Sequence, residues 1–272
     1  MTRQLSGPAR FLLVGAALLV LLWALSFALA VLWPSPLARL CPLGRDLLRP
    51  DTSVCELAFG GLWISLSVGL LAGAAATITG LGVASVARLF GGWVESALMR
   101  SADALFALPD VLVLMVLQFA AQTAGDLHPR LRISAVLLMI LSLAMVGWAA
   151  PARLFRDRLE TLERAEFVGA ARALGAGRWH LLSRHLWPFL RDYGLAIFLS
   201  RVPAAILAES TISFLGIGKI EPMSLGRYLG TSYASLLYGE GARIVVPAWV
   251  LLILIVLGTS LAGRGASAVA RH

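Results

Sequence analysis

Residues 57–87 read LAFGGLWISLSVGLLAGAAATITGLGVASVA, a run of 31 residues without a charged side chain. A helix of about 20 apolar residues crosses the hydrocarbon core of a bilayer, and backbone groups in lipid must find partners within their own helix. The run therefore predicts a membrane-spanning helix between Glu56 and Arg88. Because it is longer than one straight span needs, we expect it to be tilted or to include interfacial turns near Gly60 and Gly82.

Five further apolar runs predict an all-α, polytopic membrane protein with six transmembrane helices. These runs are Phe11–Trp33, Leu105–Ala124, Ile133–Ala152, Tyr193–Ile217 and Ile244–Gly263. The first run continues to Trp33, past the small-residue triplet Ala28-Leu29-Ala30. It is longer than the apolar core of a secretory signal peptide, so we expect an uncleaved anchor helix.

The composition excludes several other classes of protein. Hydrophobic residues make up 59% of the chain and charged residues only 14%, whereas a soluble domain carries about a quarter charged residues. This balance excludes a soluble enzyme and a disordered chain. The net charge is +8, but the basic residues lie between the apolar runs and do not gather with aromatic residues on one polar face. We therefore expect a lipid bilayer, and no nucleic acid, as the surrounding partner.

The distribution of arginine and lysine predicts the orientation of the chain, because cytoplasmic segments of membrane proteins carry an excess of both. With a cytoplasmic N-terminus, the inside segments hold 14 of these residues and the outside segments hold 8. The segment 153–191 contributes eight arginines to the inside count. We therefore expect both termini to be cytoplasmic.

The segment 153–191 is also patterned. Apolar and small residues recur at i, i+3, i+4 and i+7, which is one face of a helix; they are Phe167, Ala170, Ala171 and Leu174. Gly175 and Gly177 then interrupt the pattern, as glycines do after a helix. A second short apolar pattern follows and is closed by Pro188. The segment predicts a helix, a glycine turn and a second helix, which either lie on lipid headgroups or dock on another protein.

The motif within this segment resembles a known cytoplasmic loop. Residues 166–175 read EFVGAARALG and residues 184–188 read RHLWP. They resemble the "EAA" loop of the membrane subunits of binding-protein-dependent ABC importers. Ala170, Ala171, Gly175 and Pro188 match at the family's spacing, while Gly169 stands where the family usually has glutamate.

Three other stretches point to one branch of that family, the C-type permeases of dipeptide, oligopeptide and nickel importers. They are Gly91–Pro109 before the third predicted span, Gly147-Trp148 with Arg153 at the end of the fourth, and Leu207–Gly218 closing the fifth. The external segment departs from the branch, because Cys41, Arg45, Arg49 and Pro50 replace its usual His, Thr, Gly and Arg.

The resemblance implies a type I importer permease-like fold and a set of partners. These are a second homologous permease subunit, two ATPase domains and an external substrate-binding protein, in a bacterial inner membrane. It also implies three regions: 1–55 with the anchor helix and first external segment, 56–263 with the transmembrane domain and the coupling loop 153–191, and a tail at 264–272. The ATPase-coupling residues would be Glu166, Phe167, Ala170, Ala171, Arg172, Leu174, Gly175 and Pro188.

This chain itself is expected to be non-catalytic. It contains no Gly-x-x-x-x-Gly-Lys-Ser/Thr phosphate loop and no His-Glu-x-x-His zinc motif, so it has neither a nucleotide cradle nor a metal site of those types. We therefore expect no cofactor on this chain, with ATP and Mg²⁺ bound by the ATPase partners. The implied function is to form half of a translocation path and to couple ATP hydrolysis to uptake of peptides, or of nickel or metal chelates.

The fifth predicted span contains two charged residues. Arg201 and Glu209 are eight residues apart, about 12 Å along a helix, so they cannot pair directly. Charged groups at membrane depth are costly and usually face a cavity or a partner. One interpretation places Glu209, Ser210 and Arg201 beside the translocation path. The other has Glu209 satisfied by polar neighbours and Arg201 extending toward the membrane surface.

Several alternatives remain at this stage. Cys41 and Cys55 could form a disulfide or bind a soft metal ion. Gly69 and Gly73 have the spacing of a close helix contact, which also arises by chance. The whole chain could be a stand-alone secondary transporter, although it shows no internal repeat. It could also be a membrane scaffold that keeps the permease fold without transport, since Gly169 replaces the motif glutamate.

Overall fold

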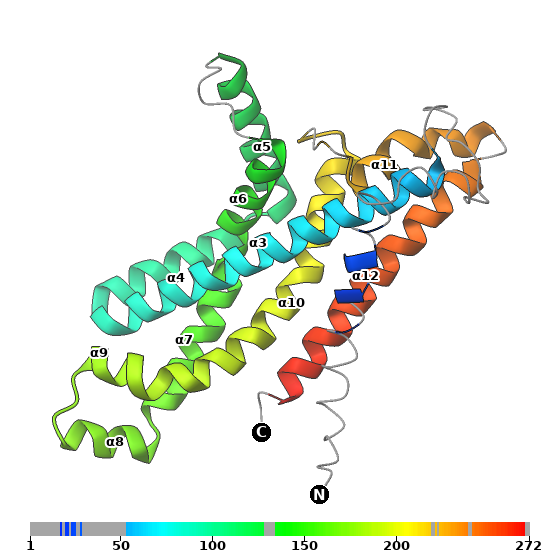
Figure 1. Cartoon of the computed structure of the whole chain (residues 1–272). Helices are drawn as coiled ribbons and strands as arrows, with labels where there is room; N and C mark the ends of the chain where they lie inside the picture. The colour runs from blue at the N-terminus through cyan, green and yellow to red at the C-terminus, as the bar shows by residue number, and fades with distance from the viewer. Residues whose placement is uncertain are drawn as a thin grey trace, which may run out of the picture.

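The computed structural model describes residues 17, 20–21, 23–25, 28, 53–127, 134–218, 221, 223–238 and 241–269. Every secondary-structure element in these ranges is helical. In chain order they are α3 (Val54–Phe90), α4 (Gly92–Phe106), α5 (Asp110–Leu127), α6 (Ala135–Gly147), α7 (Ala149–Glu163), α8 (Glu166–Ala173), α9 (Arg178–His180), the π-helical η3 (Leu181–Leu186), α10 (Trp187–Phe214), α11 (Leu225–Ser232), the 3₁₀ turn η4 (Tyr233–Tyr238) and α12 (Gly241–Val269). Helices α3, α10 and α12 run side by side, with α8 at one end of the bundle and α11 at the other (Figure 1).

Helix α3 is a single unbroken helix of 37 residues, about 55 Å long at 1.5 Å per residue. It begins with a capping box in which the Ser53 hydroxyl accepts from the Glu56 amide while the Glu56 carboxylate accepts from the Ser53 amide. Of the two alternatives for this long run, a tilted span or interfacial turns near Gly60 and Gly82, the unbroken helix excludes the turns. Both glycines have open space around them. In lipid, the backbone groups freed by a turn would find no water to bond to, so the unbroken helix is favoured.

Two of the expected spans are bent. Helices α4 and α5 meet at 93° across the break that contains Pro109, so the third apolar run contains a sharp corner, with its first two residues in α4 and the rest of its helix starting at Asp110. Helices α6 and α7 meet at 43° near Trp148. The fourth apolar run, Ile133–Ala152, predicts one span, and the bend falls near its end. Pro151 explains the bend, because its ring cannot approach the carbonyl of Gly147 four residues earlier.

The expected boundaries of the segment 153–191 also need correction. Helix α7 continues to Glu163, so the first third of this segment extends the fourth span. The helical chain from Arg178 to Phe214 is continuous, so Pro188 does not close a separate helix. A π-helical turn precedes this proline, with the Trp187 amide bonding to the Leu182 carbonyl, and such a turn accommodates a residue that cannot complete the α-helical ladder.

Small residues let the long helices approach closely. A Cβ on Gly69 would lie 2.3 Å from Ile206, and one on Gly73 would lie 3.3 Å from Val202, so both face α10. Gly80 similarly faces Pro151 on α7. The spacing of Gly69 and Gly73 therefore marks a real helix contact within this chain, of the kind that stabilises membrane helices where no hydrophobic effect drives them together.

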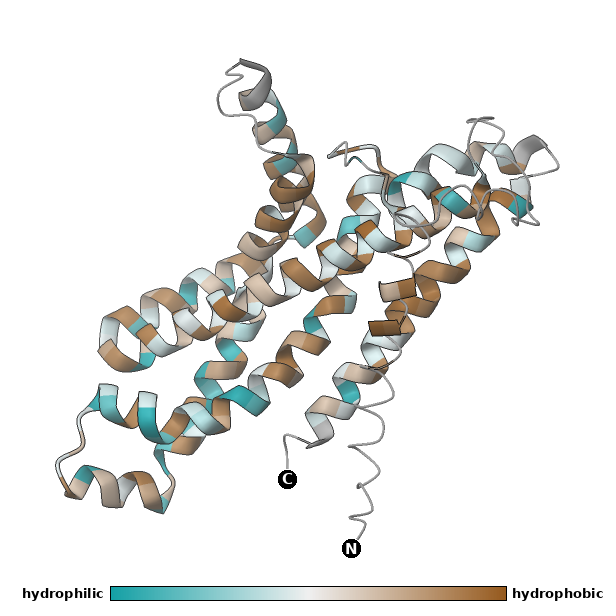
Figure 2. Ribbon diagram, viewed as in Figure 1, coloured by the Kyte–Doolittle hydropathy of each residue, from teal (hydrophilic) through white to brown (hydrophobic). Residues whose placement is uncertain are grey.

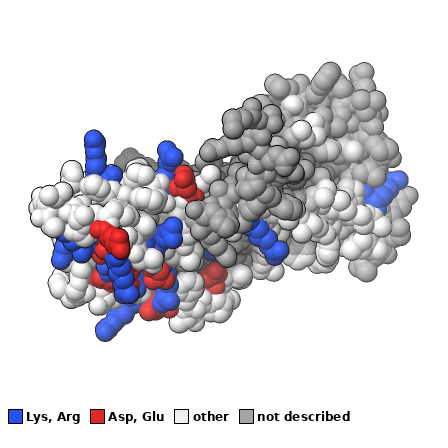
Figure 3. Space-filling model, turned by 90° about the horizontal axis from the view of Figure 1, so that it is seen from below, with Lys and Arg blue, Asp and Glu red and all other residues white. Residues whose placement is uncertain are grey.

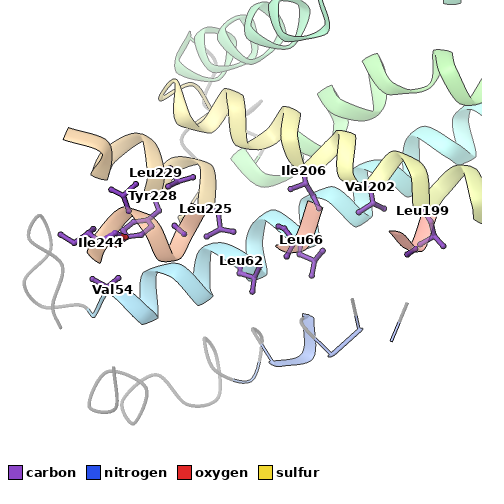
Figure 4. Close-up of a cluster of buried hydrophobic side chains, with 14 of the residues drawn as sticks. Val54, Leu62, Leu66, Leu199, Val202, Ile206, Leu225, Tyr228, Leu229 and Ile244 are labelled. Carbon is purple, nitrogen blue, oxygen red and sulfur yellow. Dashed lines mark hydrogen bonds between the residues drawn. The ribbon is translucent and has the colours of Figure 1, made fainter. Parts of the chain in front are cut away.

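The buried side chains form three clusters along the bundle. The largest joins α3, α10, α11 and α12 and includes Leu66, Val202 and Tyr228 (Figure 4). Many other large apolar side chains on the long helices are exposed, such as Ile78 and Val116. Hydrophobic residues cover much of these helices in Figure 2, as expected for a surface that faces lipid.

Three described helices are long and apolar enough to cross a membrane, and counting each bent pair as one span gives five. Most of the predicted first span, Phe11–Trp33, lies outside the described residues. Trp23 is one of its few described residues, and its ring lies 4.6 Å from that of Trp63 on α3. The count of six spans and the side on which each terminus lies stay predictions.

Candidate functional site

Helix α8 is held to the bundle by one narrow face. Val168 is fully buried in a cluster with Phe155, Leu159 and Leu190, and Ala171 packs against the same cluster. The apolar pattern in the sequence grouped Ala171 with Phe167, Ala170 and Leu174, but the structure places Val168 at the centre of the buried face. The sequence pattern did not predict that Val168 is buried. A short helix that contacts the bundle along a narrow face buries only one large side chain, and one residue makes no repeating pattern.

The opposite face of α8 is exposed. Leu174 is 90% exposed, and Glu166, Ala170 and Arg172 are also exposed. Phe167 is 42% exposed and stacks on Phe189, with ring centroids 5.6 Å apart. Pro188, next to Phe189, is exposed as well. Of the predicted coupling residues, Arg172 is exposed but reaches back to Glu163, Ala171 is only partly exposed, and the other six are exposed: Glu166, Phe167, Ala170, Leu174, Gly175 and Pro188.

Gly175 ends α8 in a conformation that favours glycine. Its φ is +89°, and its amide bonds to the Arg172 carbonyl while the Ala176 amide bonds to the Ala171 carbonyl. These two bonds define a Schellman motif, in which the two residues that flank the turn also pack together. Ala171 and Ala176 both pack against the adjacent cluster. The turn therefore fixes the angle at which the chain leaves α8.

A network of ion pairs lies beneath α8 and was not predicted from the sequence. Arg88 at the end of α3 pairs with Glu95 on α4 at 3.1 Å and with Glu163 at the end of α7. Arg156 on α7 also pairs with Glu95, at 2.8 Å. Arg172 on α8 reaches Glu163 at 3.7 Å. The network thus connects α8 with the ends of three long helices.

The network lines one side of a cleft of about 550 Å³ between α8 and the ends of α3 and α4. Arg178 closes another side, where its guanidinium donates to the Leu89 carbonyl at 3.0 Å. Charged side chains of both signs gather over the described residues at this end of the bundle (Figure 3). No sequence signal identifies the whole network, since Glu163 and Arg156 lie more than 60 residues from their partners Arg88 and Glu95.

Glu209 is buried near the other end of α10. Its carboxyl oxygens accept hydrogen bonds from Ser65 at 2.9 Å, Ser213 at 2.7 Å and Ser210 at 3.3 Å. Ser65 in turn accepts from the amide of Leu225, the first residue of α11. The carboxyl group therefore joins α3, α10 and α11. Glu209 and Ser210 are both buried within this contact.

Arg201 lies two turns away from Glu209 and points toward the bend between α6 and α7. Its Nη2 atom is 3.4 Å from the position that a Cβ on Gly147 would occupy. Its Nε is buried and has no hydrogen-bond partner among the described residues. Arg201 and Glu209 are thus in separate environments. Whether either faces a translocation path remains a prediction.

The two cysteines and the metal alternative are only partly within the described residues. Cys55 lies in the first turn of α3, whereas Cys41 lies outside the described residues, so their pairing stays a prediction. The described residues contain no group of three or more His, Cys, Asp or Glu side chains arranged to hold a metal ion.

Sequence comparison assigns the chain to a family. Residues 57–271 match the family of binding-protein-dependent transport system inner membrane components. The chain belongs to this family. The match covers all the helices from α4 to α12 and most of α3, and so includes both α8 and the Glu209 contact.

Named relatives within this transport family are peptide permeases. A putative peptide permease protein of Brucella ovis is 35% identical over 159 residues, which are 58% of this chain and 49% of the relative. The dipeptide transport system permease protein of Bacillus subtilis is 30% identical over 76% of this chain and 61% of its own length. The oligopeptide transport system permease protein of Mycobacterium tuberculosis is 29% identical over 82% and 71%. The matched part of this chain thus spans about half the length of the Brucella relatives.

Proposed function

We propose that this protein is a permease subunit of an ABC importer that takes up peptides. It forms half of the translocation path with a second, homologous permease subunit. Two ATPase domains bind and hydrolyse ATP with Mg²⁺, and an external binding protein delivers the cargo. The chain itself is non-catalytic and works in a bacterial inner membrane. Family membership and the named peptide permeases support this proposal.

The observation that carries the coupling assignment is the geometry of α8. A docking helix must present an exposed surface and must also transmit force to the bundle. Helix α8 presents Leu174, Phe167 and Ala170 outward, and it is tied to the bundle by Val168 and by the Arg172–Glu163 ion pair. Exposed apolar surface larger than a single scattered side chain marks an interaction site, and Leu174, Phe167 and Phe189 are all exposed on or beside α8. We infer that an ATPase subunit covers this surface.

The continuous helix that follows α8 supplies the lever. The chain from Arg178 to Phe214 is one helical rod, so a displacement at the α8 end moves the membrane part of α10 as a unit. Rigid-body motion of packed helices between two arrangements is a common form of conformational switching. In this proposal, closure of the ATPase pair shifts α8 and the rod, and the path alternates between its two openings.

Peptides are the proposed cargo because the relatives are named for peptides, dipeptides and oligopeptides. Nickel or metal chelates are the second choice. Uptake by whole cells that express the complete importer separates them: labelled dipeptides and longer peptides should enter in a manner that requires this chain. Uptake of nickel alone, with no peptide uptake, would overturn the cargo assignment.

The experiment that tests coupling compares two glycines. Gly175 has a positive φ and open space around it, whereas Gly177 has a φ of −71° and equally open space. Gly175→Leu therefore imposes backbone strain of about 1–2 kcal/mol on the turn, and Gly177→Leu imposes little. In reconstituted importers we expect Gly175→Leu to keep the ATPase subunits bound while uptake per ATP hydrolysed falls sharply. Uptake per ATP hydrolysed by the Gly177→Leu importer should stay close to that of the parent protein.

Two results would count against the assignment. Normal uptake by the Gly175→Leu importer would show that the turn does not set the coupling geometry. Failure to recover any nucleotide-hydrolysing subunit with the parent protein, after cross-linking at Leu174, would favour a stand-alone transporter. A recovered ATPase that a loaded binding protein does not stimulate would favour a scaffold without transport.

A further inference from the structure

Two histidines lie together on the helical chain that follows α8. His180 ends α9 and His185 lies in the π-helical turn η3. Their ring centroids are 5.6 Å apart, and the ring planes are inclined at 59°. His180 is exposed and His185 is half-buried. Neither imidazole forms a hydrogen bond or an ion pair with another residue in the ranges that the structure describes, so both keep their ring nitrogens available to a ligand.

The π-helical turn brings the two rings together. In an α-helix, residues five apart point about 140° away from each other, so the spacing of His180 and His185 in the sequence does not indicate a pair. A π-helical turn closes from residue i to residue i+5, which places residues five apart on the same side. The turn covers Leu181–Leu186, and its bond from the Trp187 amide to the Leu182 carbonyl has this spacing. The pair therefore depends on this local departure from the α-helix.

The separation of the rings suits coordination of one metal ion by both. With metal–nitrogen bonds of about 2 Å and a tetrahedral angle at the ion, two imidazole centroids on one ion lie about 5 Å apart. The observed separation of 5.6 Å is close to this value. Imidazoles suit Zn²⁺ and Cu²⁺, whereas Mg²⁺ and Ca²⁺ prefer oxygen ligands. No third His, Cys, Asp or Glu joins the pair among the described residues, so water fills the other positions of the ion.

We propose that His180 and His185 together bind one divalent transition metal ion, Zn²⁺ or Cu²⁺, as a reversible ligand. The ion joins the end of α9 to η3 and so holds the π-helical turn in its present form. The helical chain is continuous from Arg178 to Phe214, so the bound ion stiffens the end of this chain that lies next to α8 (Figure 1). Binding of the ion does not depend on the proposed function, because it requires neither cargo nor an ATPase subunit.

The test measures metal binding by the full chain, purified in detergent without a polyhistidine tag. Zn²⁺ binding is measured by calorimetry, and Cu²⁺ binding by electron paramagnetic resonance, which detects nitrogen ligands on the ion. We expect one ion per chain, with Cu²⁺ bound more tightly than Zn²⁺. His180→Gln and His185→Gln should each weaken Zn²⁺ binding about a hundredfold, because the second imidazole acts at a high effective concentration once the first has bound.

Three further variants separate the pair from other causes of binding. His128→Gln and His272→Gln are the matched controls, because they remove the two other histidines of the chain, and each should bind Zn²⁺ as the parent protein does. Pro188→Ala tests the turn without touching either imidazole. Its new amide can bond to the carbonyl four residues earlier, so the α-helix can extend back through the turn and separate the rings. Zn²⁺ binding by Pro188→Ala should fall by roughly tenfold or more.

Four results would overturn the proposal. The first is the absence of Zn²⁺ and Cu²⁺ binding by the parent protein. The second is binding that persists at parental strength in His180→Gln or in His185→Gln, which would place the ion on other ligands. The third is an equal loss in His128→Gln or His272→Gln, which would show that the ion binds single imidazoles without preference. The fourth is parental Zn²⁺ binding by Pro188→Ala, which would show that the π-helical turn does not make the site.

Discussion

The two ends of α10 are held in opposite ways. Near Glu209, the helix is joined to α3 and α11 by hydroxyl hydrogen bonds and by direct backbone packing. Near Leu186, the same helical rod is joined to α8 by a small apolar cluster and by the stacked rings of Phe167 and Phe189, and a partly exposed ion pair joins α8 to α7. The contact near Glu209 cannot shift without breaking buried hydrogen bonds and close packing. The ion pairs near α8 are partly exposed, so breaking them costs little free energy. The difference suggests a fixed end and a movable end.

The largest effect is expected where α11 packs on α10. A Cβ on Gly226 would lie 2.4 Å from the Cα and the carbonyl oxygen of Ser210, and backbone atoms cannot move aside. Gly226→Ala should therefore lower the free energy of unfolding by about 3 kcal/mol, measured as thermal unfolding in detergent. The control is Gly82→Ala on α3, where the space is open and stability should stay level or rise by about 0.5 kcal/mol. An equal change in the free energy of unfolding for Gly226→Ala and Gly82→Ala would contradict a fixed end near Glu209.

A smaller loss is expected at the buried carboxyl group. Glu209→Ala removes the acceptor shared by Ser65, Ser210 and Ser213, which should lower the unfolding free energy by about 2 kcal/mol. Glu209→Gln keeps one acceptor oxygen in place and should cost about 1 kcal/mol. Uptake by Glu209→Gln should follow the amount of assembled importer. If this variant assembles fully and still transports nothing, the carboxyl group acts in the translocation path instead.

The ion-pair network should affect coupling more than stability. Glu163→Gln weakens the contacts from Arg88 and Arg172, and because these groups are partly exposed the loss should be about 1 kcal/mol or less. Uptake per ATP hydrolysed should fall because α8 loses its link to α3 and α4. Glu160→Gln is the control, since Glu160 pairs only within and just beyond its own helix, with Arg156 and Arg164. A coupling loss of the same size in both variants would argue against transmission through Glu163.

The smallest effect on stability is expected at the exposed face of α8. Leu174→Ala should change the unfolding free energy by less than about 0.5 kcal/mol, yet it should weaken binding of the ATPase subunit in a pull-down from detergent. Val168→Ala is the contrasting variant, because it removes the buried anchor of the same helix and should cost about 2 kcal/mol. Unchanged ATPase binding by Leu174→Ala would mean that this face of α8 is not the docking surface.

Much of the helical framework could be predicted from the sequence. The apolar runs predicted α3, α5, α10 and α12 with each end within six residues of its observed place, because a span in lipid depends on length and hydropathy more than on neighbouring helices. Gly175 was correctly predicted to end α8, since the requirement for a positive φ is local. The bend at Trp148 was not predicted, because hydropathy and charge mark the limits of an apolar run and carry no information on the helix angle that Pro151 imposes.

The candidate site was predicted in composition but not in arrangement. The resemblance identified Ala170, Leu174 and Gly175, and the structure places them at an exposed surface or turn. It could not identify Val168 as the buried anchor, nor Glu163 and Glu95 as partners of Arg88. Arg88 and Glu163 are 75 residues apart and Arg156 and Glu95 are 61 apart, and no single segment carries a signal of so distant a partner.

The sequence by itself determined that this chain is helical, lies in a membrane and carries the loop of a transport family. These properties follow from local hydropathy, glycine and proline positions, and a contiguous motif. Only the tertiary structure decided that Glu209 is enclosed by serines and that α8 is tied to the bundle through Glu163. Such facts depend on which helix faces meet, and close backbone approach at Gly69, Gly80 and Gly226 sets those faces.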